Sequence, residues 1–169
     1  GGVGADAAAA RLKQFFSDKR ISGCPMKSLP ATVKVKTASW PDDAATLKAI
    51  RFEVFVTEQG VPAESEIDDN DPRSLHAIAW SDGQAAACGR LLPDGHIGRM
   101  AVRQPFRGQG VGALVLEHLI GRARQRGDRE VVLSAQTHAV GFYEKFGFIA
   151  EGSEYLDCDI PHLDMRKVL

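Results

Sequence analysis

Long hydrophobic runs are absent from this 169-residue sequence. No stretch approaches the roughly 20 consecutive apolar residues that cross a bilayer, so we expect no membrane partner. An excess of charge of one sign is absent too, because the formal net charge is −1. Without a basic excess there is no general attraction to phosphate backbones, so we expect no nucleic-acid partner. Any basic site must be local.

Cysteine is rare, with only Cys24, Cys88 and Cys158 in the sequence. Their odd number and their spacing match neither a disulfide framework nor a zinc site, which favours a reducing, cytoplasmic location. A hydrolase that uses Cys88 or Cys158 as nucleophile remains an alternative, although no pattern pairs either with a histidine. The segment DDNDPRS lacks the glycine and the distal glutamate of a calcium loop, so we expect no metal.

The remaining composition suits one globular domain. Apolar residues make up 44% of the sequence and charged residues 25%, which is enough to build and cover a core. Residues 1–30 precede the first clear core pattern and lack the apolar segment of a secretory signal. We therefore expect an N-terminal appendage over residues 1–30 and a single domain over residues 31–169.

Periodicity and turn residues predict an α/β (α+β) fold. Two Asp-Gly pairs between apolar runs indicate three antiparallel strands between residues 75 and 103. A helix over about residues 110–126 follows, and Gly127 suits its C-terminal end. The other predicted elements are strands at 32–38, 130–135, 148–156 and 161–169, and helices at 40–59 and 138–147. Together they predict a mixed, mostly antiparallel central sheet of about six to seven strands, flanked by helices and containing one βαβ unit.

The stretch RGQGVG, residues 107–112, places three glycines at the start of the predicted helix. A helix N-terminus offers unpaired N–H groups to an anion, and glycines let a phosphate approach them. Arg107 adds a charged donor. A merely flexible turn is the plain alternative. No lysine follows as a P-loop requires, and the Rossmann pattern is met only formally, because its first glycine lies too far from the preceding strand.

The segment MAVRQPFRGQGVG resembles the acetyl-CoA motif of the GNAT superfamily of N-acetyltransferases, and LSAQTHAVGFYEKFGF is similar to a second element of that family. The resemblance covers about residues 32–169 and implies the GNAT fold. The segments EVFVTEQGVP and IPHLDM are most similar to the small bacterial ElaA- or YjcF-like branch. Acetyl-CoA is the implied co-substrate. Its implied binding residues are Met100, Ala101, Val102, Arg107, Gly108, Gln109, Gly110, Val111, Gly112, Phe142 and Tyr143.

The resemblance also implies catalytic roles. The Tyr143 hydroxyl would protonate the departing thiolate, and a main-chain N–H of residues 100–102 would polarise the thioester carbonyl. The general base stays open between several side chains and a water relay. The candidates are Glu58, Glu66, His76, His138 and His162. We favour Glu58, His138 and His162, although many relatives carry an asparagine at the position of His138.

The expected function is transfer of an acetyl group to a primary amine, by direct attack in a ternary complex. A non-catalytic acetyl-CoA or CoA sensor on the same fold is the alternative. The acidic stretch of residues 64–71 has two interpretations, an attractant for a cationic amine or, more commonly, a solvated loop. A homodimer is possible for a small enzyme.

Overall fold

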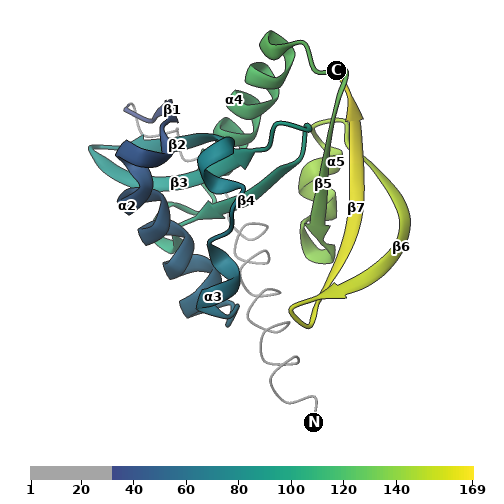
Figure 1. Cartoon of the computed structure of the whole chain (residues 1–169), viewed down its shortest axis with the longest axis horizontal. Helices are drawn as coiled ribbons and strands as arrows, with labels where there is room; N and C mark the ends of the chain where they lie inside the picture. Colours follow the sequence, from purple (N-terminus) through teal and green to yellow (C-terminus); the bar gives the residue numbers. More distant parts are fainter. Residues whose placement is uncertain (1–31) are drawn as a thin grey trace.

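The computed structural model describes residues 32–169, so the predicted appendage, residues 1–30, lies outside the described residues. Within this range the chain forms seven strands with helices packed on them (Figure 1). No helix of the described part is both long and apolar enough to cross a membrane. The prediction of a mixed, mostly antiparallel arrangement of six to seven strands flanked by helices is confirmed.

The elements follow the predicted order. The strands are β1 (Lys34–Ala38), β2 (Leu75–Ser81), β3 (Gln84–Leu91), β4 (Ile97–Val102), β5 (Glu130–Gln136), β6 (Ile149–Asp157) and β7 (Ile160–Val168). The α-helices are α2 (Trp40–Arg51), α3 (Ala63–Glu66), α4 (Val111–Arg126) and α5 (Val140–Glu144). Helix α2 continues into a π-helical segment, η1 (Phe52–Glu58), and short 3₁₀ turns are η2 (Asp71–Arg73), η3 (Gln104–Phe106) and η4 (Thr137–Ala139).

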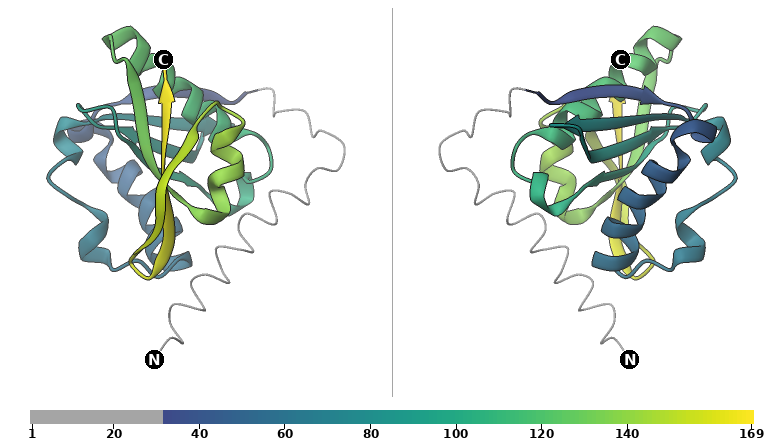
Figure 2. Two further views of the ribbon diagram at one scale, coloured as in Figure 1. Left: turned by 90° about the vertical axis from the view of Figure 1, so that its right-hand side faces the viewer. Right: turned by 90° about the vertical axis from the view of Figure 1, so that its left-hand side faces the viewer.

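Strands β1 to β4 form an antiparallel sheet whose central strands, β2 and β3, are buried on both faces, whereas the edge strand β1 is largely exposed. Successive side chains of a strand point to opposite faces, and β2 follows this rule. Ala77 and Ala79 pack in the core under α4, whereas Ile78 packs in the core under α2. The right-hand view of Figure 2 shows α2 in front of the sheet. The two helices therefore cover opposite faces.

The turn residues behave as the sequence predicts. Asp82 and Gly83 both have positive φ, at 49° and 79°, and join β2 to β3 as a two-residue hairpin. Helix α4 ends at Gly127, whose φ is 93°. The Gly127 N–H donates to carbonyls of the last turn, as in a left-handed C-terminal cap.

The last three strands form a second antiparallel sheet in the order β5-β7-β6. Only one parallel bridge, between His96 and Val132, joins this sheet to the first. The strands therefore form two sheets instead of one continuous sheet, and the single βαβ unit, β4-α4-β5, spans the junction. Strand β6 lies at the outer edge and is exposed along its whole length (Figure 2).

A bulge in β4 shapes the junction. The register between β3 and β4 shifts so that Arg99 and Met100 together face the position of Gly89. Arg99 takes a left-handed conformation, with φ of 50°. A Cβ on Gly89 would lie 2.6 Å from the Met100 sulfur and 2.8 Å from a Leu119 methyl carbon, so only glycine fits beneath the bulge.

Candidate active site

The edge of β4 that faces β5 is the first feature of the site. Strand β4 is the last strand of its sheet, and beyond the His96–Val132 bridge it has no strand partner on this side among residues 32–169. Figure 1 shows β4 and β5 diverging from that bridge. Because it has no strand partner on this side within the described chain, the edge of β4 can bind an extended ligand as an additional strand.

The glycine turn, residues 107–112, follows η3 and leads into the first turn of α4. Gly108 and Gly110 have φ of 75° and 77°, a conformation that side-chain-bearing residues rarely adopt. Gly110 is the N-cap of α4, and no side chain caps the first turn. Its N–H groups and the positive end of a 16-residue helix are thus exposed to an anion. The turn has the local geometry of a phosphate site.

A cavity of about 500 Å³ occupies the junction of the two sheets. Its walls come from four regions: the segment after α2, strands β3 and β4, strand β5 with α5, and the β6–β7 hairpin. Representative lining residues are Phe55, Gln59, Arg99, Met100, Tyr143 and His162. The cavity therefore reaches from the predicted thioester strand, β4, to side chains that the sequence scatters over more than 100 positions.

Tyr143 lies on this cavity wall, on α5. Its ring packs edge-on against Phe142 and Phe148, with ring centroids 5.1 and 5.9 Å apart. Burial raises the pKa of the Tyr143 hydroxyl to about 12, so the hydroxyl keeps its proton at neutral pH. A partly buried, protonated phenol on a cavity wall has the state that a proton donor requires.

His162, on β7, also lines the cavity and is 9% exposed. Its Nδ1 lies 2.7 Å from the carbonyl oxygen of Ile160. Because a carbonyl only accepts, Nδ1 must carry the proton in this hydrogen bond. In the neutral ring Nε2 is then the unprotonated nitrogen, which is the form that a general base requires.

Known proteins are similar to this chain in sequence and in fold. The profile of the family described as "Acetyltransferase (GNAT) domain" matches residues 41–169. The uncharacterized N-acetyltransferase YjcF of Bacillus subtilis is 39% identical over 70% of this chain and 87% of its own. Protein ElaA of Escherichia coli is 31% identical over 72% of this chain and 84% of its own. The crystal structure of an acyl-CoA N-acyltransferase from Pseudomonas aeruginosa has a TM-score of 0.73 and 35% identity, covering 81% of this chain and all of that one.

This chain belongs to the GNAT acetyltransferases. The predicted family, its fold and its enzyme class are therefore confirmed, and the ElaA- and YjcF-like branch fits these relatives. The family profile begins at residue 41, so the predicted domain boundary at residue 31 stays a prediction.

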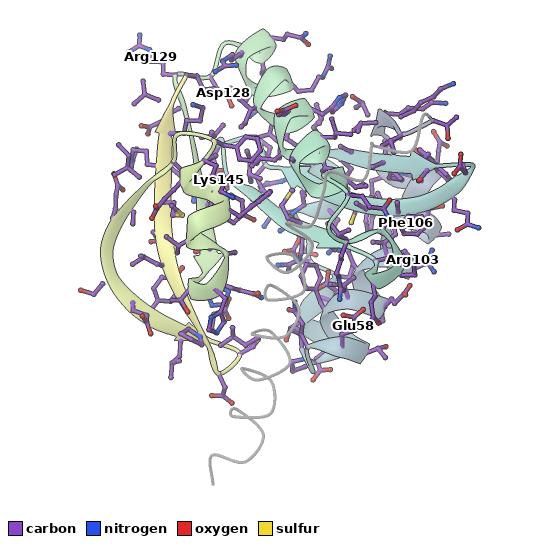
Figure 3. All side chains as sticks on the ribbon, turned by 180° about the vertical axis from the view of Figure 1, so that it is seen from behind. Glu58, Arg103, Phe106, Asp128, Arg129 and Lys145 are labelled. Atoms are coloured by element: carbon purple, nitrogen blue, oxygen red, sulfur yellow. The ribbon has the colours of Figure 1, made fainter. Side chains whose placement is uncertain are left out.

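Arg107 and Glu58 form an ion pair in this GNAT domain. The Arg107 Nη2 lies 2.6 Å from Glu58 Oε2, and its Nε donates to the Val102 carbonyl at 2.9 Å. These bonds tie the glycine turn to η1 and to the end of β4. Figure 3 shows Glu58 on the same side of the molecule as Arg103 and Phe106, while Lys145, directly after α5, lies on the opposite side. A phosphate contact of Arg107 and a basic role of Glu58 stay predictions.

The remaining predicted coenzyme residues lie on β4, in the glycine turn, in the first turn of α4 and on α5. Gln109 donates to the Pro105 carbonyl at 3.2 Å within the glycine turn, and Val111 and Gly112 are buried in the first turn of α4. Ala101 is buried, and Met100 packs against the main core. Phe142 packs against Phe146, with ring centroids 5.3 Å apart. Their contacts with a coenzyme stay predictions.

Three other base candidates have less suitable surroundings than His162. His138 lies in η4 beside the cavity, but it is not among the residues that line it. His76 is buried, its Nε2 lies 2.8 Å from the Asp71 carbonyl oxygen, and burial lowers its pKa. Glu66 lines the cavity, but its carboxylate lies 2.5 Å from Arg51 Nε. His76 and Glu66 therefore belong to the packing of the ion-pair cluster described next.

The acidic stretch, residues 64–71, is neither a solvated loop nor an open attractant for cations. Asp71 is buried and pairs with Arg51 at 2.8 Å and Arg90 at 2.9 Å. Asp68 pairs with Arg90 at 2.7 Å. Only Glu64 and Asp69 remain exposed. The other carboxylates of this stretch form ion pairs with arginines that are distant in the sequence. A local charge pattern cannot reveal such pairs.

The sequence interpretation missed a polar group on the second sheet. Ser134 Oγ and Tyr155 Oη both donate to Asp164 Oδ1, at 2.8 and 2.7 Å, and Tyr155 stacks on the His162 ring with centroids 6.0 Å apart. The register of β5, β7 and β6 brings these residues together, because Ser134 pairs with Asp164 and Tyr155 pairs with His162. No sequence signal specifies that register.

The cysteine alternative loses its chemical basis in this structure. Burial raises the pKa of the Cys88 thiol to about 12. Burial and the neighbouring Asp157 carboxylate also raise the pKa of Cys158. A nucleophilic cysteine needs the opposite shift, because the thiolate is the reactive form.

Proposed function

We propose that this protein is an acetyl-CoA-dependent N-acetyltransferase that acetylates a primary amine by direct attack in a ternary complex. The observation that carries the proposal is a combination of three features of residues 32–169: an edge of β4 without a strand partner, an α4 N-terminus without a side-chain cap, and a cavity lined by Met100 of β4 together with Tyr143 and His162. One wall thus accepts an extended, phosphate-bearing acyl donor, and the rest of the cavity accepts the amine.

The chain's own groups supply the steps. The first turn of α4 binds the diphosphate, and the free edge of β4 aligns the pantetheine arm. A backbone N–H of residues 100–102 polarises the thioester carbonyl. His162 Nε2 takes a proton from the attacking amine, because an alkylammonium ion with an ordinary pKa near 10.4 has no lone pair. Tyr143 gives its proton to the sulfur as the C–S bond breaks.

The products are an N-acetylated amine and free CoA, so the reaction needs no metal or redox partner. His162 then returns its proton to water, and the second proton, which the nitrogen loses as the amide forms, reprotonates Tyr143. The predicted homodimer and cytoplasmic location stay predictions and play no part in this mechanism.

Incubation with acetyl-CoA and a panel of primary amines tests the proposal, with mass spectrometry of the N-acetyl products and assay of the released CoA thiol. We expect equal amounts of product and thiol. Acetyl-CoA that binds stoichiometrically without turnover of any amine would favour the sensor alternative. Thiol released without an N-acetyl product would point to thioester hydrolysis and contradict the proposed transfer.

A further inference from the structure

Two arginines on the cavity wall have no role in the proposed binding of the coenzyme. Arg90 comes from β3 and Arg99 from the bulge of β4, and both line the cavity. A third arginine of the same ion-pair cluster, Arg51, does not line it. The first sheet therefore contributes two arginine side chains to the cavity wall, whereas α5 contributes Tyr143 and β7 contributes His162.

Arg90 has a hydrogen-bond donor left over. Its side chain is 94% buried, since only 6% of it is exposed. Its two Nη atoms bind Asp68 and Asp71, but Nε has no hydrogen-bond partner among the described residues. A buried, charged N–H without a partner is costly, and native structures rarely tolerate one without a reason. A ligand in the cavity is the partner that would satisfy it.

Arg99 is only weakly held by the protein. Its Nε and Nη2 donate to carbonyls of Glu66 and Ser65 at 3.2 and 3.3 Å, and Nη2 also reaches Asp68 at 3.3 Å. These distances lie at the long end of the hydrogen-bond range. Its Nη1 makes no hydrogen bond within residues 32–169, and 28% of the side chain is exposed. The guanidinium therefore keeps donors for an incoming acceptor.

The charges of the ion-pair cluster indicate the charge of the ligand that would bind to these donors. Arg51, Arg90 and Arg99 balance Glu66, Asp68 and Asp71, so the acidic stretch has no excess charge to attract an ammonium group. Unused donors, however, remain on Arg90 and Arg99. Donors of this kind are satisfied best by a carboxylate, which accepts paired N–H groups. Asp157, on the hairpin, is the other acidic residue on the cavity wall, and it lies outside these ion pairs.

We propose that the acceptor is a primary amine that also carries a carboxylate, such as a free amino acid, and that Arg99 and the Arg90 Nε bind the carboxylate. The inference rests on the proposed acetyltransferase function. The acidic end of the acceptor lies against the first sheet, and its amino group points across the cavity to Tyr143 and His162. Arg90 and Arg99 are then specificity residues that bind the acceptor without taking part in proton transfer.

The test compares reaction products that differ only in the acidic group. A panel of N-acetyl amino acids and the matching N-acetyl amino acid amides is titrated calorimetrically into the protein with and without CoA. For at least one pair we expect the acid to bind about 10- to 100-fold more tightly than the amide, the usual value of a hydrogen-bonded charge. Arg99→Gln should remove this difference and Arg99→Lys should restore part of it.

Arg122→Gln, which removes an exposed arginine from α4, is the matched control and should leave the acid-to-amide ratio unchanged. A purely structural Arg99 would weaken acid and amide equally, which would overturn the proposal. Equal affinities in the wild type, or no binding of any acid, would overturn it as well. Acetyl-CoA binding and turnover of the amine panel are measured on the same samples. Failure of the acetyltransferase function then appears separately, as loss of coenzyme affinity or as coenzyme binding without turnover.

Discussion

The two halves of the proposed site, one for the coenzyme and one for the acceptor, are built in different ways. The coenzyme half consists of backbone groups from one continuous stretch, β4, the glycine turn and the start of α4. The acceptor half consists of side chains from the segment after α2, the start of β4 and the β6–β7 hairpin. A backbone site tolerates changes in most side chains, whereas a side-chain site changes its ligand with a few substitutions. The difference explains how one fold keeps its acyl donor and varies its acceptor.

Tyr143 stands between the two halves, and its loss gives the largest expected effect on the rate. Tyr143→Phe should lower kcat about 10²- to 10⁴-fold, the range of general acid catalysis, without changing acetyl-CoA affinity. Because the folded-state pKa is about 12, the hydroxyl stays protonated below that value and should cause no loss of activity up to about pH 10. Steady-state kinetics over pH 6–10 check both. Unchanged kcat would remove Tyr143 from the mechanism.

The buried charges of the acceptor half should dominate its stability. Arg51→Met removes the nearest charged partner of buried Glu66 and one of the two arginine partners of buried Asp71, which costs about 3–5 kcal/mol of unfolding free energy. Arg103→Gln is the control, because its ion pair with Glu53 is 37% exposed on both sides and should contribute less than about 1 kcal/mol. Urea unfolding gives both values. Equal losses would show that burial of the cluster has no special importance.

Variants of His162 and Glu58 distinguish proton transfer in the acceptor half from binding in the coenzyme half. His162→Gln should lower kcat/KM about 10- to 100-fold near pH 7 and recover activity at alkaline pH, where the amine loses its proton unaided. Glu58→Gln breaks the Arg107 pair and should mainly raise KM for acetyl-CoA, by less than about tenfold. The pH–rate profiles of both variants decide the assignment. Alkaline rescue of Glu58→Gln instead of His162→Gln would reverse the roles.

The smallest expected effect is on the loss of folding stability in acid. Burial favours protonation of Asp68, but the hydrogen bond and charge of Arg90 outweigh it and hold the pKa of Asp68 below its ordinary value of 3.8. A depressed folded-state pKa stabilises the protein above about pH 4, and this contribution is lost as the pH falls through the folded-state pKa. Asp68→Asn should therefore flatten the fall in urea midpoint between pH 5 and 3.

Asp69→Asn changes the exposed neighbour in the same loop and serves as the control for that series. Its urea midpoints should follow those of the wild type across the pH range. If all three proteins lose stability with the same pH dependence, the ion pair between Asp68 and Arg90 is not the source of the acid sensitivity.

The coenzyme half was predictable because its signals are local. Gly108 and Gly110 specify their own backbone conformation, and the helix pattern that follows specifies the anion site. The acceptor half was not, because its partners meet only through tertiary structure. Asp71 pairs with Arg51 and Arg90, and Tyr155 with His162, across registers that one-dimensional periodicity leaves open. Arg99 was missed for the same reason, since a bulge and not the strand period sets its direction.

The central claim is that the turn between β4 and α4 binds the diphosphate of acetyl-CoA. Calorimetric titration of acetyl-CoA into wild type, Gly110→Trp and Gly127→Trp tests it most directly. Both glycines have positive φ, at 77° and 93°, and they flank opposite ends of α4, so the two variants carry similar backbone strain. We predict micromolar binding to the wild type and to Gly127→Trp, and a loss of more than about 100-fold for Gly110→Trp alone. Equal affinity for all three proteins, or no binding to the wild type, would contradict the account.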